Sequence, residues 1–591
     1  MNTNEKLAAL RAKMREDAID AYIILSEDAH QSEYVAAHWR SREWLTGFDG
    51  SAGAAAVTQN KAVLWVDGRY YIQAARQIAG SAFQMIKAGI DDTGIYDWLA
   101  EELLPGAVVG VDGRTLSVSA FEKYDVELTP HGIKFETGID LIADIWQARP
   151  SLPQNAIFEH SVKYAGKTRI EKLSELRVLM RKKGMNGYLI SSLDDIAWLF
   201  NLRGNDIAFL PVFYAYAFIG MSDAFLFVDE AKLSCELKNI ILSDGIILRP
   251  YGEIEHFLLR YHKPGAVFID PDRISIYLKE LFSDIVLRRG TELSSNLKAV
   301  KNETELRNTK HTQVKDGVAM VQFIKWLKEK IGSCELEEAD IHDKLLEFRG
   351  EQDGFAGASF FSIAAYMSNA ALMHYSPIKG KSAKLARYGM LLCDSGGQYL
   401  GGTTDITRTI ALGEVPDEMK RDFTTVLRAH IALATTRFLY GASGAYLDVI
   451  PRRMMWAEGL DYKCGTGHGI GYFLSVHEGP QRFRFASDHS ARLEPGMLLT
   501  NEPGIYKEGC WGIRTENTMQ VVLDIKTTDG QFLKFETISY CPIDLEAIDT
   551  EALSAEERTW LNGYHATVYE KLAPALDQEH RQWLKEHTRE I

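Results

Sequence analysis

Two aspartates in the second half of the chain stand where neighbouring strands are expected to end. The apolar run Tyr388–Leu392 leads to Asp394, and the turn residues Ser-Gly-Gly-Gln follow it. A second strand-like segment then carries Asp405. Two strands joined by such a turn lie ~5 Å apart, so the two carboxylates can converge from adjacent strands.

Three more side chains that can bind metal follow further along the chain. His468 lies in Gly-Thr-Gly-His-Gly-Ile-Gly, among glycines that let backbones approach closely. Glu502, in Asn-Glu-Pro-Gly, ends one strand-like segment, and Glu516, in Gly-Ile-Arg-Thr-Glu-Asn, lies on the next. A single carboxylate after a strand is usually a turn residue, and a lone histidine is usually structural. The ordered set of five is what indicates a site.

Four carboxylates in one pocket repel each other unless some of them protonate. Two divalent cations remove this repulsion, because four negative ligands balance four positive charges. Ions roughly 3.5–4 Å apart provide a water that is ionised near neutral pH, and they polarise a carbonyl oxygen. The oxygen-rich set favours manganese first, with zinc or cobalt as alternatives. We therefore predict two divalent metal ions, held by Asp394, Asp405, His468, Glu502 and Glu516.

The segments that precede these residues contain an internal repeat. The pattern from Leu10 to Ile24 recurs at the same spacing from Leu176 to Ile190. Each copy predicts a helix that leads into a β-branched or aromatic strand. We therefore expect two related α/β domains, over residues 1–155 and 156–300.

A third domain is predicted over residues 301–591. From about Glu303 a long charged helix begins, with apolar residues such as Val318 on one stripe. Glycine, histidine and acidic residues crowd into the strand-like segments that follow, so the chemistry is expected there. The capping-box pattern Ser554–Glu557 predicts a helical extension from about residue 550.

The composition is that of a globular protein. The 591 residues are 46% hydrophobic and 25% charged, with a net charge of −15, which argues against nucleic-acid and anionic-membrane partners. The most apolar stretch, Ile207–Met221, contains Pro211 and is too short to span a bilayer, so we expect a buried strand there. Six scattered cysteines indicate free thiols. The sequence predicts a cytoplasmic protein.

The motifs, taken together, resemble a known family. Gly-Thr-Thr-Asp-Ile-Thr-Arg, Val-His-Glu-Gly-Pro and the histidine and glutamate motifs given above resemble the metallopeptidases of pita-bread fold, and among them the long, three-domain aminopeptidase P branch. Residues 47–53 and 67–70 extend the likeness to the first domain. The resemblance implies mixed α/β and α+β structure, with two creatinase-like α/β domains before a pita-bread catalytic domain. It also implies a homodimer that removes the N-terminal residue of peptides with proline in second position.

The resemblance assigns roles to individual residues. Asp405 and Glu516 correspond to the ligands that bridge the two metals. His374, in His-Tyr-Ser-Pro, and His477, in Val-His-Glu-Gly-Pro, correspond to two catalytic histidines that contact substrate. Taken alone, either histidine would more often be structural. Arg514 corresponds to an arginine that orients the ligands, although it could also be a surface charge.

Three further roles are expected around the site. Glu502 should accept the proton of the attacking water and pass it to the leaving proline nitrogen. Arg69 should reach the substrate from the first domain or from a partner subunit, unless it only caps a surface turn. Cys464 stands where the family usually has a histidine beside the substrate pocket. As a smaller and weaker donor it could change substrate preference or rate, or it could be a buried filler.

Other functions remain open on the same fold. Prolidase, which cuts only dipeptides ending in proline, is the nearest alternative, but the doubled N-terminal domains favour the enzyme for longer peptides. Methionine aminopeptidase lacks those domains, and creatinase-type hydrolysis lacks the metal ligands. A non-catalytic pita-bread binding protein would typically have lost some ligands, whereas all five positions are filled here.

Overall fold

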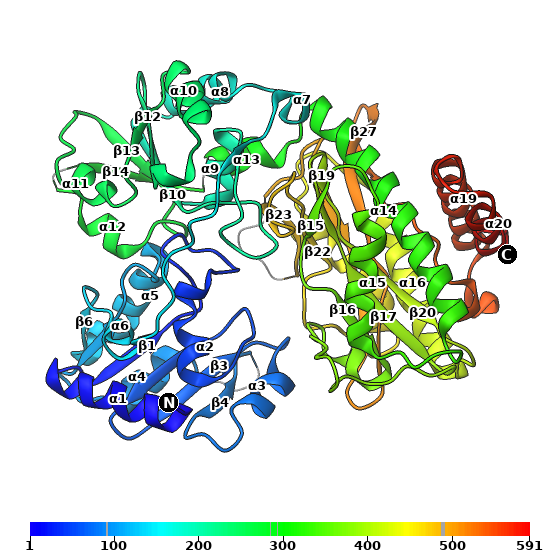
Figure 1. Ribbon diagram of the computed structural model, residues 1–591, viewed down its shortest axis with the longest axis horizontal. Helices are drawn as coiled ribbons and strands as arrows, with labels where there is room; N and C mark the ends of the chain where they lie inside the picture. The colour runs from blue at the N-terminus through cyan, green and yellow to red at the C-terminus, as the bar shows by residue number, and fades with distance from the viewer. Residues whose placement is uncertain (90–92, 284, 292, 486–490) are drawn as a thin grey trace. The chain divides into compact units, whose positions relative to one another are not determined.

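The computed structural model describes residues 1–89, 93–283, 285–291, 293–485 and 491–591, which form two compact units (Figure 1). The N-terminal unit comprises Met1–His160 and Lys167–Ser295, and the C-terminal unit comprises Ser161–Gly166 and Asn296–Ile591. All predicted site residues except Arg69 lie in the C-terminal unit.

The N-terminal unit contains two six-stranded sheets with the same topology. Their strand orders are β4-β3-β2-β1-β5-β6 and β12-β11-β10-β8-β13-β14. In both sheets the second and third pairings in this order are antiparallel and the other three are parallel. The strands are β1 Ala21–Ile24, β2 Ala54–Thr58, β3 Ala62–Val66, β4 Gln84–Lys87, β5 Val108–Val111, β6 Lys134–Glu136, β8 Met185–Ile190, β10 Ala215–Gly220, β11 Ala224–Val228, β12 Ile247–Arg249, β13 Ala266–Ile269 and β14 Val286–Arg289, with a small pair β7 Phe158–Glu159 and β9 Leu202–Arg203.

The predicted repeat begins each of these sheets. Helix α1 (Thr3–Glu16) leads into β1, and helix α8 (Arg169–Lys182) leads into β8. Both helices start with a capping box, in which the side chain before the helix and a glutamate inside it exchange hydrogen bonds with the backbone. The leucine and methionine of the repeated pattern are buried in both copies. The two related α/β domains expected from the sequence are confirmed.

Short helices complete this unit. They are α2 Ser41–Thr46, α3 Tyr71–Gln77, α4 Ile95–Glu102, α5 Val118–Leu128, α6 Leu141–Ile145, α9 Leu193–Leu199, α10 Cys235–Ser243, α11 Glu253–Leu259 and α12 Ile276–Glu280. The strand expected over Ile207–Met221 is shorter than the apolar run: β10 covers only Ala215–Gly220, all of it buried, and Ile207 and Leu210 form an isolated bridge before it.

The C-terminal unit is built on two main sheets. A six-stranded sheet has the order β21-β28-β27-β24-β22-β23, and a three-stranded sheet has the order β16-β17-β20. Their strands are β16 Ile363–Tyr366, β17 Met390–Ser395, β20 Ile406–Ala411, β21 Arg437–Leu439, β22 Gly467–Gly469, β23 Glu478–Phe483, β24 Leu498–Asn501, β27 Asn517–Thr527 and β28 Gly530–Thr537. Small sheets add β15 Phe355–Ala358, β18 Gly397–Tyr399, β19 Gly402–Thr403, β25 Gly504–Lys507 and β26 Trp511–Arg514.

Long helices cover these sheets. In Figure 1, α14 (Glu303–Lys330) and α15 (Glu338–Gly350) run across the front of the unit, and α19 (Ala555–Leu572) and α20 (Gln578–His587) stand at its side. Capping boxes begin α14 and α19, as the sequence predicted for α19. The remaining helices are α16 Asp417–Ala434, α17 Gly444–Leu447, α18 Val449–Ala457, the single turn α7 Val162–Ala165 and α13 Leu293–Ala299, which crosses from one unit to the other.

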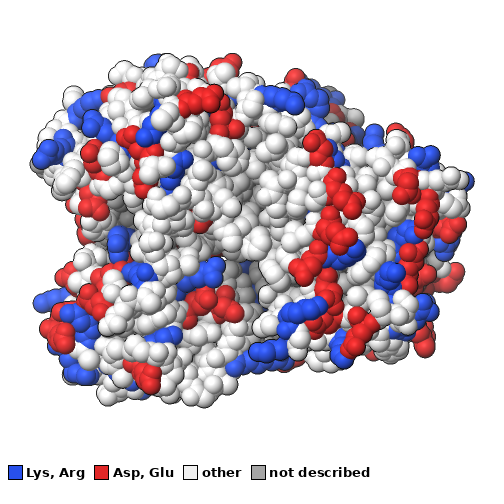
Figure 2. Space-filling view, viewed as in Figure 1, with Lys and Arg blue, Asp and Glu red and all other residues white. Residues whose placement is uncertain are grey.

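Surface and thiol chemistry are ordinary. Acidic and basic side chains both occur on the face shown in Figure 2, and uncharged residues cover much of it. All six cysteines are free thiols. Within the described ranges, none of the helices combines the length and the apolar character that crossing a membrane requires.

Candidate metal centre

The predicted carboxylate ligands lie at strand ends, as the sequence suggested. Asp394 is the fifth residue of β17 and faces Thr407 of the antiparallel partner β20. Asp405 directly precedes β20. The hairpin of β18 and β19 fills the segment between them. The two aspartates therefore come from neighbouring ends of paired strands.

The two glutamates have an equivalent placement in the larger sheet. The last residue pair of β24 and β27 joins Asn501 to Asn517. Glu502 directly follows β24 and Glu516 directly precedes β27, so both flank the same end of the ladder. His468 lies in β22, the other neighbour of β24.

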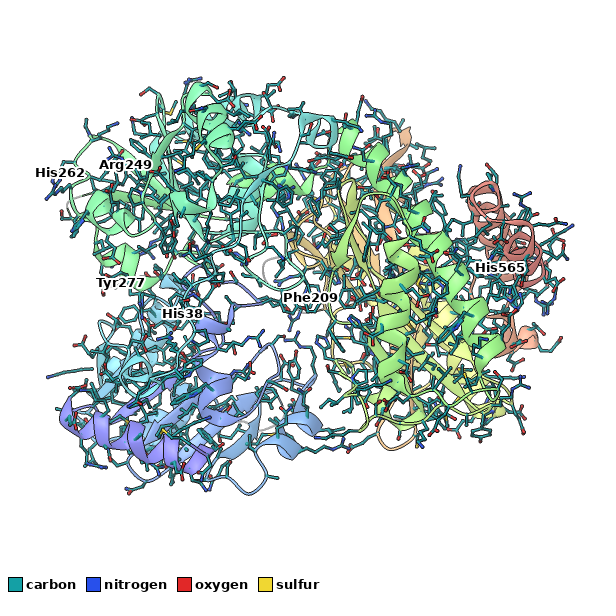
Figure 3. The ribbon with its side chains drawn as sticks, viewed as in Figure 1. His38, Phe209, Arg249, His262, Tyr277 and His565 are labelled. Atoms are coloured by element: carbon teal, nitrogen blue, oxygen red, sulfur yellow. The ribbon has the colours of Figure 1, made fainter. Side chains whose placement is uncertain are left out.

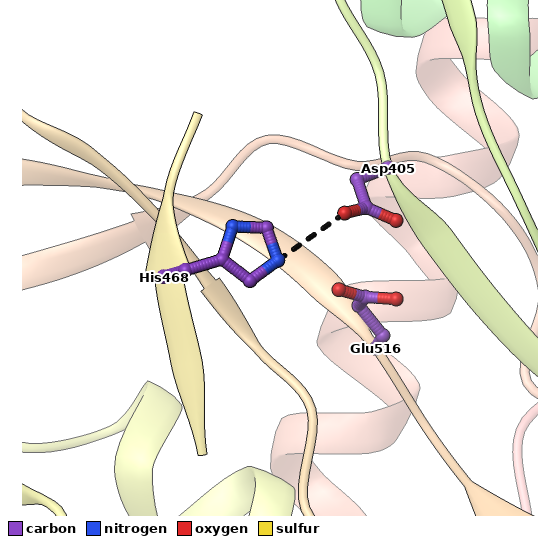
Figure 4. A group of neighbouring side chains, drawn as sticks. All are labelled: Asp405, His468 and Glu516. Carbon is purple, nitrogen blue, oxygen red and sulfur yellow. Dashed lines mark ion pairs between the residues drawn. The ribbon is translucent and has the colours of Figure 1, made fainter. Parts of the chain in front are cut away.

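The side chains of Asp405, His468 and Glu516 meet in a tight group. One possible ligand atom from each lies within 4.8 Å of the other two, and the three side chains point toward one another in Figure 4. His468 Nε2 is 3.4 Å from Asp405 Oδ2 and 3.4 Å from Glu502 Oε1. His468 Nδ1 lies 2.9 Å from the carbonyl oxygen of Gly469, which fits a hydrogen on Nδ1 and leaves Nε2 free to bind a metal.

Arg514 ties the remaining carboxylates to this group. It is only 3% exposed, so it is not the surface charge that the sequence left open. Its guanidinium donates to Asp394, to the Tyr506 hydroxyl at 2.6 Å and to the Thr407 hydroxyl at 3.1 Å. Arg514 Nε, the atom that donates to the Thr407 hydroxyl, lies 4.0 Å from Glu502 Oε2. Through these contacts one cation adjoins two of the predicted ligands.

The electrostatics are those of a crowded acidic centre. Burial raises the pKa of Asp394 to about 7; the charges of Asp405 and Glu502 add to this rise, and Arg514 opposes it. Burial, and then the same two neighbouring carboxylates, hold the pKa of Glu516 well above its usual range. Burial alone would lower the pKa of His468, but the hydrogen bond to Asp405 and the charge of Glu502 outweigh it and raise that pKa to about 9. In the protein without metal ions, the raised pKa values of Asp394, Glu516 and His468 mean that these groups hold protons more readily than usual, and a bound cation would replace those protons.

Two buried oxygens in this group have no donor. Asp394 Oδ1 and Glu516 Oε1 are buried and lack a hydrogen-bond partner in the described part of the chain. Leaving a buried carboxylate oxygen unsatisfied costs about 1–3 kcal/mol or more, and a bound cation removes that cost. Four carboxylates and one imidazole are also the donors that manganese, zinc or cobalt accept. The residues present fit a divalent metal centre.

His477 lies beside this group. Its ring is 4.3 Å from that of His468, centroid to centroid, and meets it edge-on at 83°. It is partly buried and directly precedes β23. His374 is also partly buried, and it follows the 3-10 helix Met367–Ala371. That helix lies so close to β26 that a Cβ on Gly512 would be 1.7 Å from the Ala370 carbonyl oxygen, so glycine is needed there.

Cys464 and Arg69 have different surroundings. Cys464 is partly buried near Glu502 and Arg514, and burial raises the pKa of its thiol to about 12, so the thiol stays protonated. Arg69, in the N-terminal unit, makes a two-point contact with Asp67, at 3.0 Å from Nε to Oδ1 and 2.7 Å from Nη2 to Oδ2. Its participation in the site stays a prediction.

Sequence reasoning missed several residues that support the centre. The Thr407 hydroxyl donates to Glu516 Oε2 at 2.7 Å, and the buried Arg408 donates to the Glu516 carbonyl at 2.7 Å. Glu478, next to His477, is buried against Lys298 and Lys301. Thr407 and Arg408 lie in the motif Asp-Ile-Thr-Arg, and Glu478 lies in Val-His-Glu-Gly-Pro. Their position inside motifs already noted is the sequence signal that could have identified them.

Comparison with known proteins places the chain in a family. Residues 6–145 and 148–305 match two models of the creatinase/prolidase N-terminal domain. Residues 307–522 match metallopeptidase family M24, and residues 531–591 match the C-terminal region of peptidase M24.

Individual relatives match along most or all of their length. The probable Xaa-Pro aminopeptidase P of Laccaria bicolor is 38% identical over 603 residues, covering 99% of this chain and 93% of the relative. Aminopeptidase P2 of Arabidopsis thaliana is 37% identical, covering 100% and 88%. The crystal structure of X-prolyl aminopeptidase from Caenorhabditis elegans, described as a cytosolic enzyme with a di-nuclear active site, superposes with a TM-score of 0.96 at 32% identity and covers both chains fully.

These matches confirm the family and the fold class that the motifs predicted. The chain belongs to the Xaa-Pro aminopeptidase P family of M24 metallopeptidases, with two creatinase-type α/β domains before the pita-bread catalytic domain.

Proposed function

We propose that the protein removes the N-terminal residue from peptides whose second residue is proline, using two divalent metal ions. One observation carries the proposal: Asp405, His468 and Glu516 place possible ligand atoms within 4.8 Å of one another, and the buried oxygens Asp394 Oδ1 and Glu516 Oε1 lack hydrogen-bond partners in the described part of the chain. Full-length likeness to Xaa-Pro aminopeptidases supports the substrate class.

Asp394, Asp405, His468, Glu502 and Glu516 would hold the two ions. Manganese is the first choice, and zinc or cobalt could replace it. When bound, the two ions supply a water that is ionised near neutral pH and a Lewis acid for the scissile carbonyl. Arg514 holds Asp394 in place and keeps positive charge beside Glu502.

The protein side chains move the proton and bind the developing charge. Glu502 accepts the proton of the attacking water and delivers it to the proline nitrogen as that bond breaks. The proline nitrogen carries no hydrogen, so the leaving group needs this delivery. His477 and His374 donate to the carbonyl oxygen as it becomes negative, an effect worth about 2.7–4 kcal/mol per donor.

Further parts of the proposal concern the rest of the molecule. We assign residues 1–155 and 156–300 to the two creatinase-like domains and 301–591 to the catalytic domain. Arg69 and Cys464 contribute to the substrate site, and the enzyme is a cytoplasmic homodimer. The cytosolic description of the nematode relative supports the location.

Replacing Glu502 with glutamine tests the proposal. The variant keeps the size of the side chain but cannot carry the proton, so we expect kcat on a Xaa-Pro-Xaa tripeptide with manganese to fall at least ~100-fold. Glu508→Gln, in the exposed turn between β25 and β26, is the matched control and should retain full activity. Unchanged turnover by Glu502→Gln would remove that residue from the mechanism. Cleavage of Xaa-Pro dipeptides alone would instead identify a prolidase.

A further inference from the structure

Arg408 is a buried cation that has no carboxylate partner among the residues that the structure describes. It is 2% exposed, and none of the ion pairs among the described residues involves it. Its guanidinium instead makes six hydrogen bonds to neutral groups, five of them far away in the sequence. Burying a charge is unfavourable unless hydrogen bonds replace the lost water, so the surroundings of Arg408 are built to hold it.

The first contacts of Arg408 join two strands that carry predicted metal ligands. Nη1 donates to the carbonyl of Thr407 in β20 at 2.8 Å and to the carbonyl of Glu516 at 2.7 Å. The Glu516 amide in turn donates to the Thr407 carbonyl at 3.2 Å. Asp405 lies three residues before Arg408, at the start of β20. The guanidinium therefore joins the backbone of Thr407, two residues after Asp405, to that of Glu516, and the adjoining strands β20 and β27 belong to different sheets.

The C-terminal helix α19 supplies the other side of this junction. Nη2 of Arg408 donates to the Tyr564 hydroxyl at 2.8 Å and to Asn517 Oδ1 at 2.8 Å. The same hydroxyl lies 3.2 Å from Asn517 Oδ1 and 2.9 Å from the Cys541 carbonyl, either of which can accept its proton. Next along the helix, His565, labelled in Figure 3, is fully buried and accepts from the Ile543 amide at 3.1 Å. This face of α19 is thus hydrogen-bonded into the core.

The contacts extend from Asn517 to the other glutamate. Asn517 Nδ2 is 3.1 Å from Nε2 of His430, a ring whose pKa burial lowers to about 3, so the ring is neutral and Nε2 can accept. His430 Nδ1 then donates to the Asn501 carbonyl at 3.0 Å, and Asn501 Nδ2 returns a bond to the His430 carbonyl at 2.9 Å. Asn501 directly precedes Glu502. One network of hydrogen bonds thereby reaches the backbone beside both glutamates.

We propose that Arg408 and Tyr564 are positioning residues for the metal centre, and that the C-terminal helical extension is needed to complete that centre. Arg408 holds the backbone of Thr407, two residues after Asp405, against that of Glu516, and Tyr564 fixes the guanidinium. The inference rests on the proposed metal ligands. Partners behind metal ligands typically change affinity or activity ~10–100-fold when they are removed.

Tyr564→Phe tests this proposal because it deletes one hydroxyl and keeps the ring that stacks on Trp560. In metal-stripped protein we expect manganese affinity, measured by titration, to fall ~10-fold. Hydrogen exchange at the amides of Glu516 and Asn517 should speed up without metal. Tyr569→Phe is the matched control, since the described chain offers its hydroxyl no partner, and it should leave both readouts unchanged.

The outcomes separate this inference from the proposed function. If the wild-type protein takes up no manganese, the proposed function fails, while faster exchange in Tyr564→Phe would still support the junction. If Tyr564→Phe only lowers thermal stability, and its metal affinity and exchange match those of Tyr569→Phe, the positioning role is overturned. Arg408→Lys keeps the charge but cannot make six bonds, so it should lose more affinity than Tyr564→Phe; equal or smaller loss would also overturn the proposal.

Discussion

Asp394→Asn should stabilise the metal-free protein and abolish its stabilisation by manganese. Burial and the neighbouring carboxylates raise the pKa of Asp394 from 3.8 to about 7. A group whose pKa is raised by folding gives its full stabilising effect below pH 3.8 and loses it as pH rises to about 7. Each pKa unit corresponds to about 1.36 kcal/mol, so at pH 8 the ionised carboxylate destabilises the metal-free protein by up to about 4 kcal/mol.

Asparagine removes this repulsion and can still accept the hydrogen bond from Arg514. We therefore expect the metal-free variant to unfold at a higher urea concentration than the wild type at pH 8. At pH 5 the wild-type aspartate is mostly protonated, so the difference should shrink to less than half. Manganese at 100 times its Kd stabilises a protein that binds it by about 2.7 kcal/mol, and the variant should lack this gain.

Urea unfolding of chelator-treated protein measures the free energy of unfolding under the four conditions that the prediction needs: pH 5 and pH 8, each with and without added manganese. Asp529→Asn is the control, because that aspartate is exposed in the turn between β27 and β28 and the chemical change is the same. A metal-free Asp394→Asn protein that is less stable than wild type at pH 8 would refute the reasoning. A gain in stability over the wild type that is equal at pH 5 and pH 8 would also refute the reasoning, because loss of the Asp394 charge could then not be its cause.

Two further predictions concern the same group. Manganese should bind more tightly as pH rises from 6 to 9, because the ions must displace protons. Asp394 holds its proton below a pKa of about 7, and His468 holds one below a pKa of about 9. Titration with manganese at several pH values should show this rise, and a constant affinity would contradict it. Arg514→Lys should lower kcat/KM ~10–100-fold although the positive charge is kept, since an ammonium cannot bind Asp394, Tyr506 and Thr407 together. Steady-state kinetics that match the wild type would show that a positive charge alone is enough for the role of Arg514.

The sequence predicted those features of the structure that are determined by short segments of the chain. The ligand-bearing positions could be predicted because strand, turn and glycine signals surround each of them, and the structure brings Asp405, His468 and Glu516 together. Helix starts with capping boxes, such as that of α19 at Ser554, were equally visible. The repeat of α1 and α8 predicted the two related sheets because a buried leucine and methionine recur at the same spacing.

The hydrogen-bond network around Arg408 could not be predicted, for a physical reason. Five of its six hydrogen-bond partners lie 108 to 156 residues away, and most of the six are backbone carbonyls, which every residue possesses. A carbonyl acceptor leaves no mark on the amino-acid type. The separation of β17 and β20 from β24 and β27 into two sheets was hidden in the same way, because strand pairing between distant segments depends on packing. Arg69 illustrates another limit, since a turn residue that holds Asp67 has the same sequence pattern as one that serves a distant site.

The order of the ligands along the chain governs when an ion can be captured in the cell. Synthesis delivers Asp394 first, Glu516 much later and Tyr564 last, and at ~5–20 residues per second roughly 9–34 s separate the first from the last. Until Glu516 has been added, no growing chain can present all five predicted ligands. If Tyr564 is needed to complete the centre, as proposed, an ion is held firmly only after that residue has also been added.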